Sequence, residues 1–346
     1  MPITAQYYNM PLRDGVKLAT LVVRPDEKGA YPFIVIRSPY GGGRGGLAED
    51  VLEFCENGLG FIVQEARGTG FSEGTADLWR QEKQDAEDFL NWISEQPWFN
   101  GRLVTNGESY PGFTQWHAAR NAHPVMVGLT PHNAPLDIYH GSYFSGGAYG
   151  MGLGCGWAFG MFASRNKLTT TKSWKQLPFE VPLKELDMAL YGKRWDLWRQ
   201  WMAHPDFDSF WKDADGFQDM EKITAPAFIT GGWYDLFLMQ TLRAFSEIRK
   251  KAASPEARNY SRLVLEPLDH DMRTAEVDYG DSYLDGIIAT RNRFMKNILL
   301  QPDQDPLPGH APLRFFVMGS NQWMEADEWP LPQAEMQNWY LHGQSP

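Results

Sequence analysis

The chain has 346 residues, of which 43% are hydrophobic and 14% aromatic, so it is long enough and apolar enough to bury a sizeable core. Its net charge of -11 opposes capture by a phosphate backbone, and we therefore expect no nucleic-acid partner. The only two cysteines, Cys55 and Cys155, offer neither a disulfide framework nor a metal-ligand spacing, and we expect both to be small core residues.

The N-terminal third alternates short apolar runs with helical patterns. Residues 12–25 predict a hairpin, because two alternating runs flank the turn signal Asp14-Gly15. The apolar runs at 33–37 and 61–65 predict buried strands. Residues 81–96 predict a helix, because their apolar side chains recur at i, i+3, i+4 and i+7 and so share one face.

The same alternation continues along most of the chain. Further strands are predicted at 102–106, 126–130, 226–230 and 262–266, with helices near 110–121, 236–251 and 282–299. Alternating strands and helices favour a parallel sheet that is covered by helices on both faces.

Two regions interrupt this alternation. Residues 140–222 contain no clear buried strand and predict a helical insertion rich in tryptophan, with Trp157, Trp174, Trp195, Trp198, Trp201 and Trp211. From Gln301 the sequence becomes rich in proline and then gives two β-like runs, 313–319 and 338–343. We interpret this end as a linker followed by the beginning of a β domain.

Two segments bear on location. The first 15 residues have no basic n-region followed by an apolar h-region, so we expect a cytoplasmic protein. Residues 141–163 carry no charge and are about long enough to cross a bilayer, but they are rich in glycine and poor in aliphatic side chains. We expect this segment to lie over a pocket, and we expect no membrane partner.

The run NGESYPGF, residues 106–113, places Ser109 between two glycines, at the corner between a predicted strand and a predicted helix. There the free N–H groups of the helix N-terminus can receive a developing oxyanion. A serine hydroxyl is a weak nucleophile unless a base takes its proton, and the base needs an acidic partner. A His and an Asp are therefore expected at the ends of later strands.

Asp235 follows the apolar run of residues 227–232, and His270 follows a strand that breaks at Pro267. The chain order Ser, Asp, His is the one that the α/β-hydrolase sheet requires. Each residue also has a simpler interpretation: the serine motif occurs by chance, Asp235 could cap a helix, and His270 could be a solvated loop residue or a metal ligand. Two other histidines, His132 and His140, are weaker alternatives for the base.

The chain resembles the X-Pro dipeptidyl-peptidase-like and cocaine esterase-like (CocE/NonD) serine hydrolases. The resemblance extends over nearly the whole chain and rests on these blocks: LRDGVKLAT (12–20), IRSPYGG (36–42), EARGTGFSEG (65–74), QPWFNGRLVTNGESYPGFTQWHAA (96–119), ITAPAFITGGWYD (223–235), LVLEPLDH (263–270) and LRFFVMGSNQW (313–323).

The resemblance implies an α/β-hydrolase with an inserted helical cap and the start of a C-terminal, jelly-roll-like β domain. We place the catalytic domain at 1–139 and 223–300, the cap at 140–222, and the linker with the truncated β domain at 301–346.

The resemblance also implies residue roles. Ser109 is then the nucleophile, Asp235 the acid and His270 the base, while the Tyr40 side chain and the Tyr110 amide receive the oxyanion. No cofactor and no metal are required.

The sequence departs from the family in two places. Two additional carboxylates, Asp269 and Asp271, flank the base and should favour its protonated form. The chain also ends after what we interpret as the first strands of the β domain. Three explanations fit that end: a fragment, a truncated gene product, or a chain completed by self-association into a homo-oligomer.

The substrate class stays open between a small-molecule ester and a short X-Pro peptide. Trp157, Trp233 and Phe237 are candidates for an apolar acyl pocket, with plain core packing as the alternative. A peptidase needs an acidic anchor for the free N-terminus, for which the insertion offers Glu180, Glu185, Asp187, Asp206 and Asp208.

Two other classes of function are alternatives to a serine hydrolase. One is a non-catalytic α/β-hydrolase scaffold, truncated and retained for binding or assembly. The other, a nicotinamide-dependent enzyme, lacks the glycine fingerprint and the ribose-binding acid.

Overall fold

The computed structural model describes residues 3–41, 48–170, 175, 181–274, 276–279, 286–302, 304–340 and 343. In this part of the chain, ten strands form one sheet in the order β1-β2-β4-β3-β5-β6-β7-β8-β9-β10. Neighbours from β4 to β9 are parallel, and an antiparallel hairpin closes each edge. The strands are β1 Thr4–Pro11, β2 Lys17–Arg24, β3 Tyr31–Ser38, β4 Gly60–Glu65, β5 Phe99–Glu108, β6 Met126–His132, β7 Phe228–Gly232, β8 Arg262–Glu266, β9 Leu313–Val317 and β10 Gln322–Ala326.

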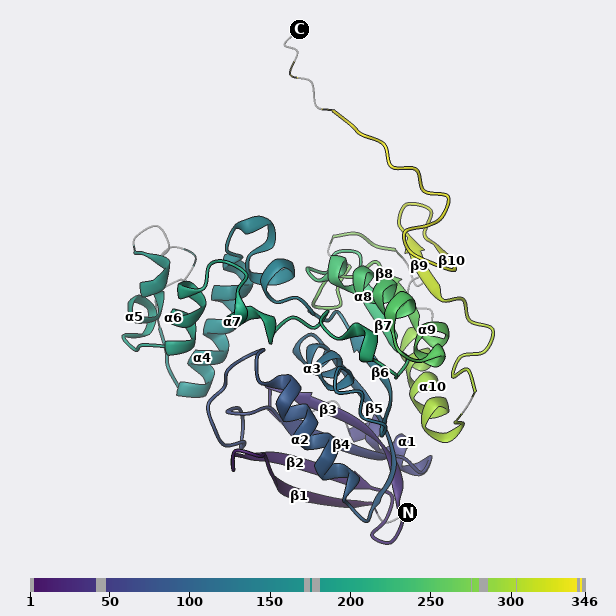
Figure 1. Ribbon diagram of the computed structural model, residues 1–346. Helices are drawn as coiled ribbons and strands as arrows, with labels where there is room; N and C mark the ends of the chain where they lie inside the picture. The colour runs from purple at the N-terminus through teal and green to yellow at the C-terminus, as the bar shows by residue number, and fades with distance from the viewer. Residues whose placement is uncertain are drawn as a thin grey trace.

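Helices cover both faces of the sheet, as its apolar strands require (Figure 1). One core layer packs against α2 (Glu82–Ser94), α3 (Tyr110–Ala119) and α8 (Leu238–Lys251). The opposite layer packs against α1 (Ala48–Glu56) and α10 (Ile287–Leu300). A short helix, α9 (Pro255–Tyr260), follows α8, and Ser254 caps it by accepting a hydrogen bond from the Ala257 amide.

Most predicted elements are present with small shifts of their ends. The first strand of the N-terminal hairpin lies at Thr4–Pro11, upstream of the run at 12–25 that predicted it, and the turn falls at the Asp14-Gly15 signal as expected. The apolar face of α2 is buried as its periodicity predicts. Acidic residues in its first turn, Glu82 and Asp85, favour the positive end of the helix dipole.

The tryptophan-rich segment forms a group of short helices, which Figure 1 shows to one side of the sheet, at the upper left of the view. Its helices are α4 (Ala158–Asn166), α5 (Leu186–Tyr191), α6 (Asp196–Ala203) and α7 (Ser209–Lys212). They pack around an aromatic core cluster centred on Trp198, Trp201 and Trp211, which also includes Tyr110 and Phe113 of α3. Short helices are marginally stable by themselves, so packing against this aromatic cluster supplies most of the stabilisation of α4 to α7. Trp174 and Glu180 lie outside the described residues.

The C-terminal segment differs from its prediction. We expected 313–319 to open a separate β domain, but β9 pairs with β8 and extends the central sheet. The reason is two-sided burial: Leu313 and Phe315 pack into one core layer while Phe316 is buried on the other face.

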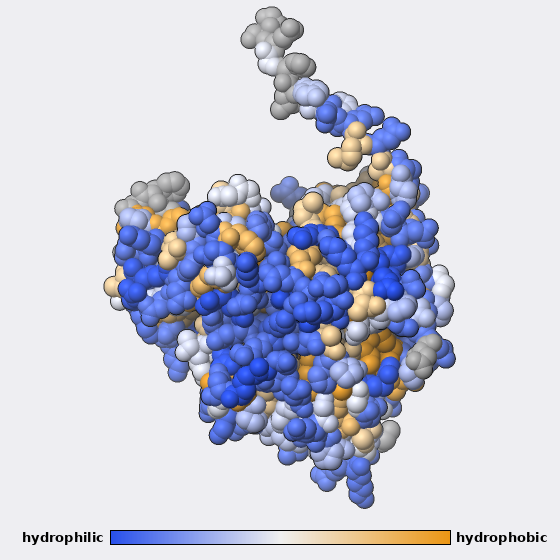
Figure 2. Space-filling view, viewed as in Figure 1, coloured by the Kyte–Doolittle hydropathy of each residue, from blue (hydrophilic) through white to orange (hydrophobic). Residues whose placement is uncertain are grey.

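The second predicted β-like run is wrong in its described part. Residues 338–340 form no strand, and β10 at Gln322–Ala326 is the partner of β9 instead. After β10, Trp329 and Leu331 pack against the central core, and the tail that follows them extends away from the body (Figures 1 and 2). Trp339 in this tail is 90% exposed.

None of the helices in the described ranges combines the length and the apolarity that a bilayer crossing needs. Residues 141–163, which we weighed as a span, form short π and 3-10 turns that lead into α4.

Candidate active site

Ser109 occupies a sharp corner between β5 and α3. Its backbone has φ 61° and ψ -122°, a conformation that non-glycine residues rarely adopt. The Ser109 amide donates to the carbonyl oxygen of His132 at 2.9 Å, which ties the corner to the end of β6. The hydroxyl therefore stands clear of the sheet at the N-terminus of α3.

Two glycines make this corner possible. A Cβ on Gly107, whose φ is 147°, would lie far inside van der Waals contact with Pro111. A Cβ on Gly112 would lie 2.5 Å from the Cβ of Ala134. The spacing Gly-x-Ser-x-x-Gly thus reflects the close approach of α3 to β5 at Gly107 and to the loop after β6 at Gly112.

The structure brings Ser109, His270 and Asp235 together. His270 Nε2 lies 2.9 Å from Ser109 Oγ, and His270 Nδ1 lies 2.5 Å from Asp235 Oδ2. The Asp235 side chain is fully buried, and its other oxygen accepts from the Phe237 amide at 2.7 Å. The three residues come from the ends of β5, β7 and β8, so they meet at the carboxyl edge of the parallel strands.

The pKa of His270 is raised above its ordinary value. Burial by itself would lower it, but the hydrogen bond and the charge of Asp235 outweigh burial, and the charges of Glu108 and Asp271 add to the increase. Of the two flanking carboxylates that we expected to act on the base, Asp271 does so. Asp269 instead accepts hydrogen bonds from the amides of Asp271 and Arg273 and holds the loop.

This environment predicts a pH effect. A general base works only when neutral, so a raised His270 pKa moves the acidic limb of kcat/KM above the ordinary histidine value near 6.5. Glu108→Gln removes a negative charge that favours the protonated ring, so the limb should move to lower pH. Asp269→Asn is the matched control and should leave it in place. Kinetics from pH 5 to 9 check this, and a limb unmoved by Glu108→Gln would contradict it.

Tyr40 and Tyr110 lie beside the serine. The Trp157 indole donates to the Tyr40 hydroxyl at 3.2 Å, and the Ser109 side chain and the Tyr110 amide lie near enough to that hydroxyl to lower its pKa in part. Although 51% of the Tyr40 surface is exposed, enclosure of its hydroxyl raises its pKa, so the phenol keeps its proton at neutral pH. The Tyr110 ring is buried and its hydroxyl donates to Glu82 at 2.8 Å, which fixes the first turn of α3.

The three candidate pocket residues have different surroundings. Trp157 contacts the Tyr40 hydroxyl and stacks on Tyr110, so it borders the serine. Phe237 is buried edge-on against the His270 ring at 5.3 Å and supports the base. Trp233 is partly buried and packs against the central core, and its indole donates to the Phe316 carbonyl. These contacts of Trp233 fit plain core packing, which was the alternative to a role in the acyl pocket.

Sequence reasoning missed Glu108 and Asn133. The Asn133 side chain accepts from the Gly232 amide at 3.0 Å and lies near enough to Glu108 to lower the pKa of that carboxyl, so it connects the serine strand with the loop that carries Asp235. Its backbone has φ 42°, which Asn tolerates better than most residues. The available signal was a polar residue directly after a predicted strand, at the edge where the other candidates lie.

Gly232 marks the closest approach of the Asp and His loops. A Cβ there would overlap the carbonyl of Leu268, which is backbone and cannot swing aside. We expect Gly232→Ala to cost about 1 to 3 kcal/mol of unfolding free energy, measured by denaturant or thermal melting. The matched control is Gly160→Ala on α4, where a Cβ meets nothing within 4 Å and should not destabilise. Equal melting of the two variants would contradict the expectation.

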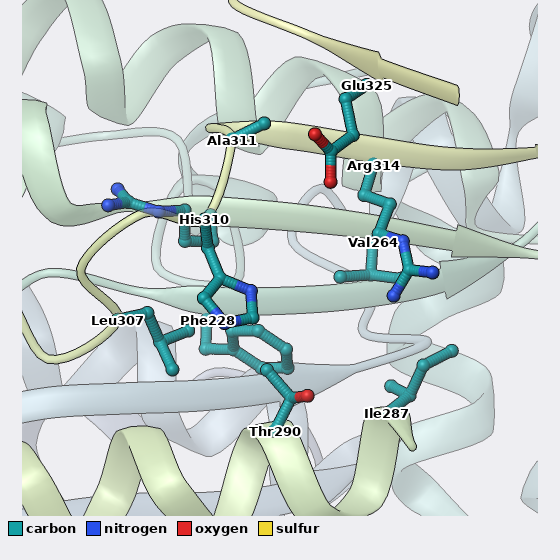
Figure 3. Close-up of a pocket in the computed structure, with 10 residues that line it drawn as sticks. Phe228, Val264, Ile287, Thr290, Leu307, His310, Ala311, Arg314 and Glu325 are labelled. Carbon is teal, nitrogen blue, oxygen red and sulfur yellow. The ribbon is translucent and has the colours of Figure 1, made fainter. Parts of the chain in front are cut away.

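Two cavities of the molecule differ in size and in position. A groove of about 840 Å³ begins at Tyr40 and runs between the loop at 69–78 and α4, where Met161 and Phe162 line it. A crevice on the α10 face, lined by residues that include Phe228, Thr290 and His310 (Figure 3), has about 20 Å³, which is room for a single water. Of these two cavities, only the groove is large enough to accept a substrate.

No group of three or more His, Cys, Asp or Glu side chains with the arrangement of a metal site occurs in the described part of the chain.

Comparison with known proteins places these features in a family context. A family model described as X-Pro dipeptidyl-peptidase (S15 family) matches residues 14–271. Cocaine esterase from Rhodococcus sp. (strain MB1 Bresler) is 30% identical over 360 residues, which cover 96% of this chain and 61% of that protein.

Two solved structures share the architecture. An aminopeptidase from a marine sediment archaeon, Thaumarchaeota archaeon, superimposes with a TM-score of 0.76 at 23% identity, over 95% of this chain and 59% of that one. A CocE/NonD family hydrolase from Staphylococcus aureus gives 0.70 at 22% identity, over 96% and 57%. The chain thus spans about three fifths of the length of these relatives, and the α/β-hydrolase fold is confirmed.

Proposed function

The chain belongs to the X-Pro dipeptidyl-peptidase (S15) family, and from that premise we propose that it is a serine hydrolase that cleaves ester or amide bonds through an acyl-enzyme intermediate. The observation that supports this most directly is the continuous contact from Ser109 Oγ through His270 to the buried Asp235 carboxylate. A buried acid, an imidazole and a hydroxyl in this order are the parts that nucleophilic acyl transfer needs.

In the proposed first step, Ser109 Oγ attacks the substrate carbonyl carbon while His270 Nε2 takes the hydroxyl proton. The carbonyl π electrons move to oxygen, and the Tyr40 hydroxyl and the Tyr110 amide donate to this oxyanion. One such donor contributes about 3 to 4 kcal/mol to the transition state. When the tetrahedral intermediate collapses, the leaving group takes the proton from His270, and the acyl group remains on Ser109.

In the second step, His270 removes a proton from water, whose oxygen attacks the acyl carbon. The same donors hold the oxyanion, and Ser109 regains its proton from His270 as the acid product leaves. Asp235 stays ionised and keeps the Nδ1 proton of His270 directed toward itself, so that Nε2 is free to accept. The reaction uses only this chain and water.

Within this class, the contacts of the insertion favour esters over X-Pro peptides. Glu185 and Asp187 pair with Arg199, and Asp208 pairs with His204 while capping α7. Three of the candidate anchors for a free ammonium are thus engaged inside the insertion. No carboxylate lines the described walls of the groove beside Tyr40 either.

We further propose that residues 140–222 act as a cap over the serine. The groove beside Tyr40 has one wall from the loop at 69–78 and one from α4, so the insertion would hold part of the substrate. Residues 1–139 and 223–300 then form the catalytic domain, to which β9 and β10 add an edge.

A fluorophosphonate probe tests the proposal. We expect covalent labelling of the wild type and none of Ser109→Ala, with both proteins equally folded by circular dichroism. An unlabelled, well-folded wild type would favour the non-catalytic scaffold. Comparison of p-nitrophenyl esters with Ala-Pro-p-nitroanilide then separates esterase from dipeptidyl-peptidase, and preference for the anilide would contradict the ester assignment.

A further inference from the structure

A hydrogen bond crosses from the proposed cap to the Tyr40 hydroxyl beside the serine. The Trp157 indole nitrogen lies 3.2 Å from the Tyr40 hydroxyl oxygen, although the two residues are 117 positions apart. Trp157 ends a π turn (Gly152–Trp157) that continues into α4, whereas Tyr40 follows β3 of the central sheet. This contact joins two parts of the molecule at the reacting group.

The chemistry of the indole fixes the direction of this bond. An indole N–H can only donate, so the Tyr40 oxygen must accept from Trp157. The single hydroxyl proton of Tyr40 is then left for another partner, and the Ser109 side chain lies beside the same hydroxyl.

The other end of the network leads to the same assignment. Asp235 is an acceptor, so His270 carries its proton on Nδ1, and Nε2 accepts from the Ser109 hydroxyl. Ser109 has then used its only proton, so its oxygen is available as an acceptor for the Tyr40 proton. All donors therefore run one way, from Trp157 through Tyr40 and Ser109 to His270.

We infer that Trp157 is a positioning residue for the reaction: by donating to the Tyr40 oxygen it directs the Tyr40 proton toward Ser109, where the oxyanion forms during attack. This inference rests on the proposed hydrolase function. It assigns Trp157 a role distinct from that of a pocket wall, because the role depends on one N–H group rather than on the area of the ring.

The packing around Trp157 suits this role. Its ring stacks on Tyr110 at 6.0 Å and lies 5.0 Å from Trp79. The Trp79 indole in turn donates to the Tyr143 hydroxyl at 3.0 Å, and Trp79 is only 3% exposed. Rings anchored in this way limit rotation of the indole, so its N–H keeps one direction. Because Trp157 belongs to the proposed cap, the position of the cap would set the orientation of Tyr40.

A double-mutant cycle with Trp157→Phe and Tyr40→Phe tests the inference, with a p-nitrophenyl ester as substrate. Trp157→Phe keeps an aromatic ring but removes the N–H. We expect it to lower kcat about three- to tenfold, the value of one neutral hydrogen bond, with KM within about twofold. Tyr40→Phe should lower kcat about a hundredfold or more. The double variant should equal Tyr40→Phe, because the indole then has no hydroxyl to direct.

Trp198→Phe is the matched control, since its indole donates to the Leu183 carbonyl inside the same group of short helices. It should leave kcat near that of the wild type. The inference is overturned if Trp157→Phe lowers kcat by the same factor with and without Tyr40, or if it raises KM alone. Ser109→Ala distinguishes failure of the proposed function from failure of the inference about Trp157. If Ser109→Ala still cleaves the ester, the proposed function fails. If it is inactive but the effects of Trp157→Phe and Tyr40→Phe on kcat multiply in the double variant, only the role of Trp157 fails.

Discussion

Replacement of His270 by alanine is expected to lower kcat for a p-nitrophenyl ester about 10⁶-fold. The ring accepts from Ser109 Oγ at 2.9 Å, and without it no described side chain is placed to take that proton. Nucleophile and base act as a unit, so Ser109→Ala should cost about as much, and the double variant should be no slower than either single variant. The residual rate would come from the oxyanion donors and binding, and steady-state kinetics at pH 8 measure all three proteins.

His140→Ala is the control for this prediction. His140 was an alternative for the base, but its ring is 58% exposed and pairs with Asp137, with no contact to the serine in the described structure. Its replacement should leave kcat unchanged within about twofold. An active His270→Ala beside an inactive His140→Ala would reverse the assignment, and a double variant much slower than either single variant would show that serine and histidine act independently.

Each part of the site that the sequence predicted depends on a local pattern within one short stretch of chain. Gly107, Ser109 and Gly112 lie within six positions, and their pattern follows from close packing at one corner. Asp235 and His270 each follow a buried apolar run, so their location at strand ends was readable from the runs alone. Their meeting point then followed from the rule that parallel strands end at one edge.

The parts that the sequence did not predict depend on pairing between distant strands. Glu108 matters because β5 pairs with β6 in a register that opposes it to His132, beside Asn133. No local pattern gives that register. Trp157 and Trp233 illustrate the same limit, because both follow apolar segments, yet one borders the serine and the other packs against the core. Only the three-dimensional packing separates them.

The C-terminal strand shows how composition can mislead about one element. The run at 313–319 has the composition of a β-domain strand and also of a buried strand in a parallel sheet, since both are rich in aromatic and β-branched residues. Its partner decided the outcome: β8 would otherwise present an open edge, and β9 covers it.

Asp235→Asn is expected to lower kcat about 10⁴-fold while the protein stays folded. The reason lies in the second contact of the carboxylate. The Phe237 amide donates to Oδ1, so an asparagine would keep its carbonyl oxygen there and turn its NH₂ toward His270. Nδ1 would then have to accept, which moves the ring proton to Nε2 and leaves Ser109 without a base. Kinetics above the acidic limb measure this loss.

The control for Asp235→Asn is Asp271→Asn, which also removes a negative charge near the ring but whose carboxylate pairs with Arg273 instead of His270. If only the loss of a negative charge mattered, the two variants would lose similar amounts of activity. If the tautomer matters, Asp271→Asn should retain nearly full kcat above the acidic limb, whereas Asp235→Asn should be slow at every pH at which the ring is neutral. Comparable activity of the two variants would mean that Asp235 does not hold the proton on Nδ1, and the case for an activated serine would fail with it.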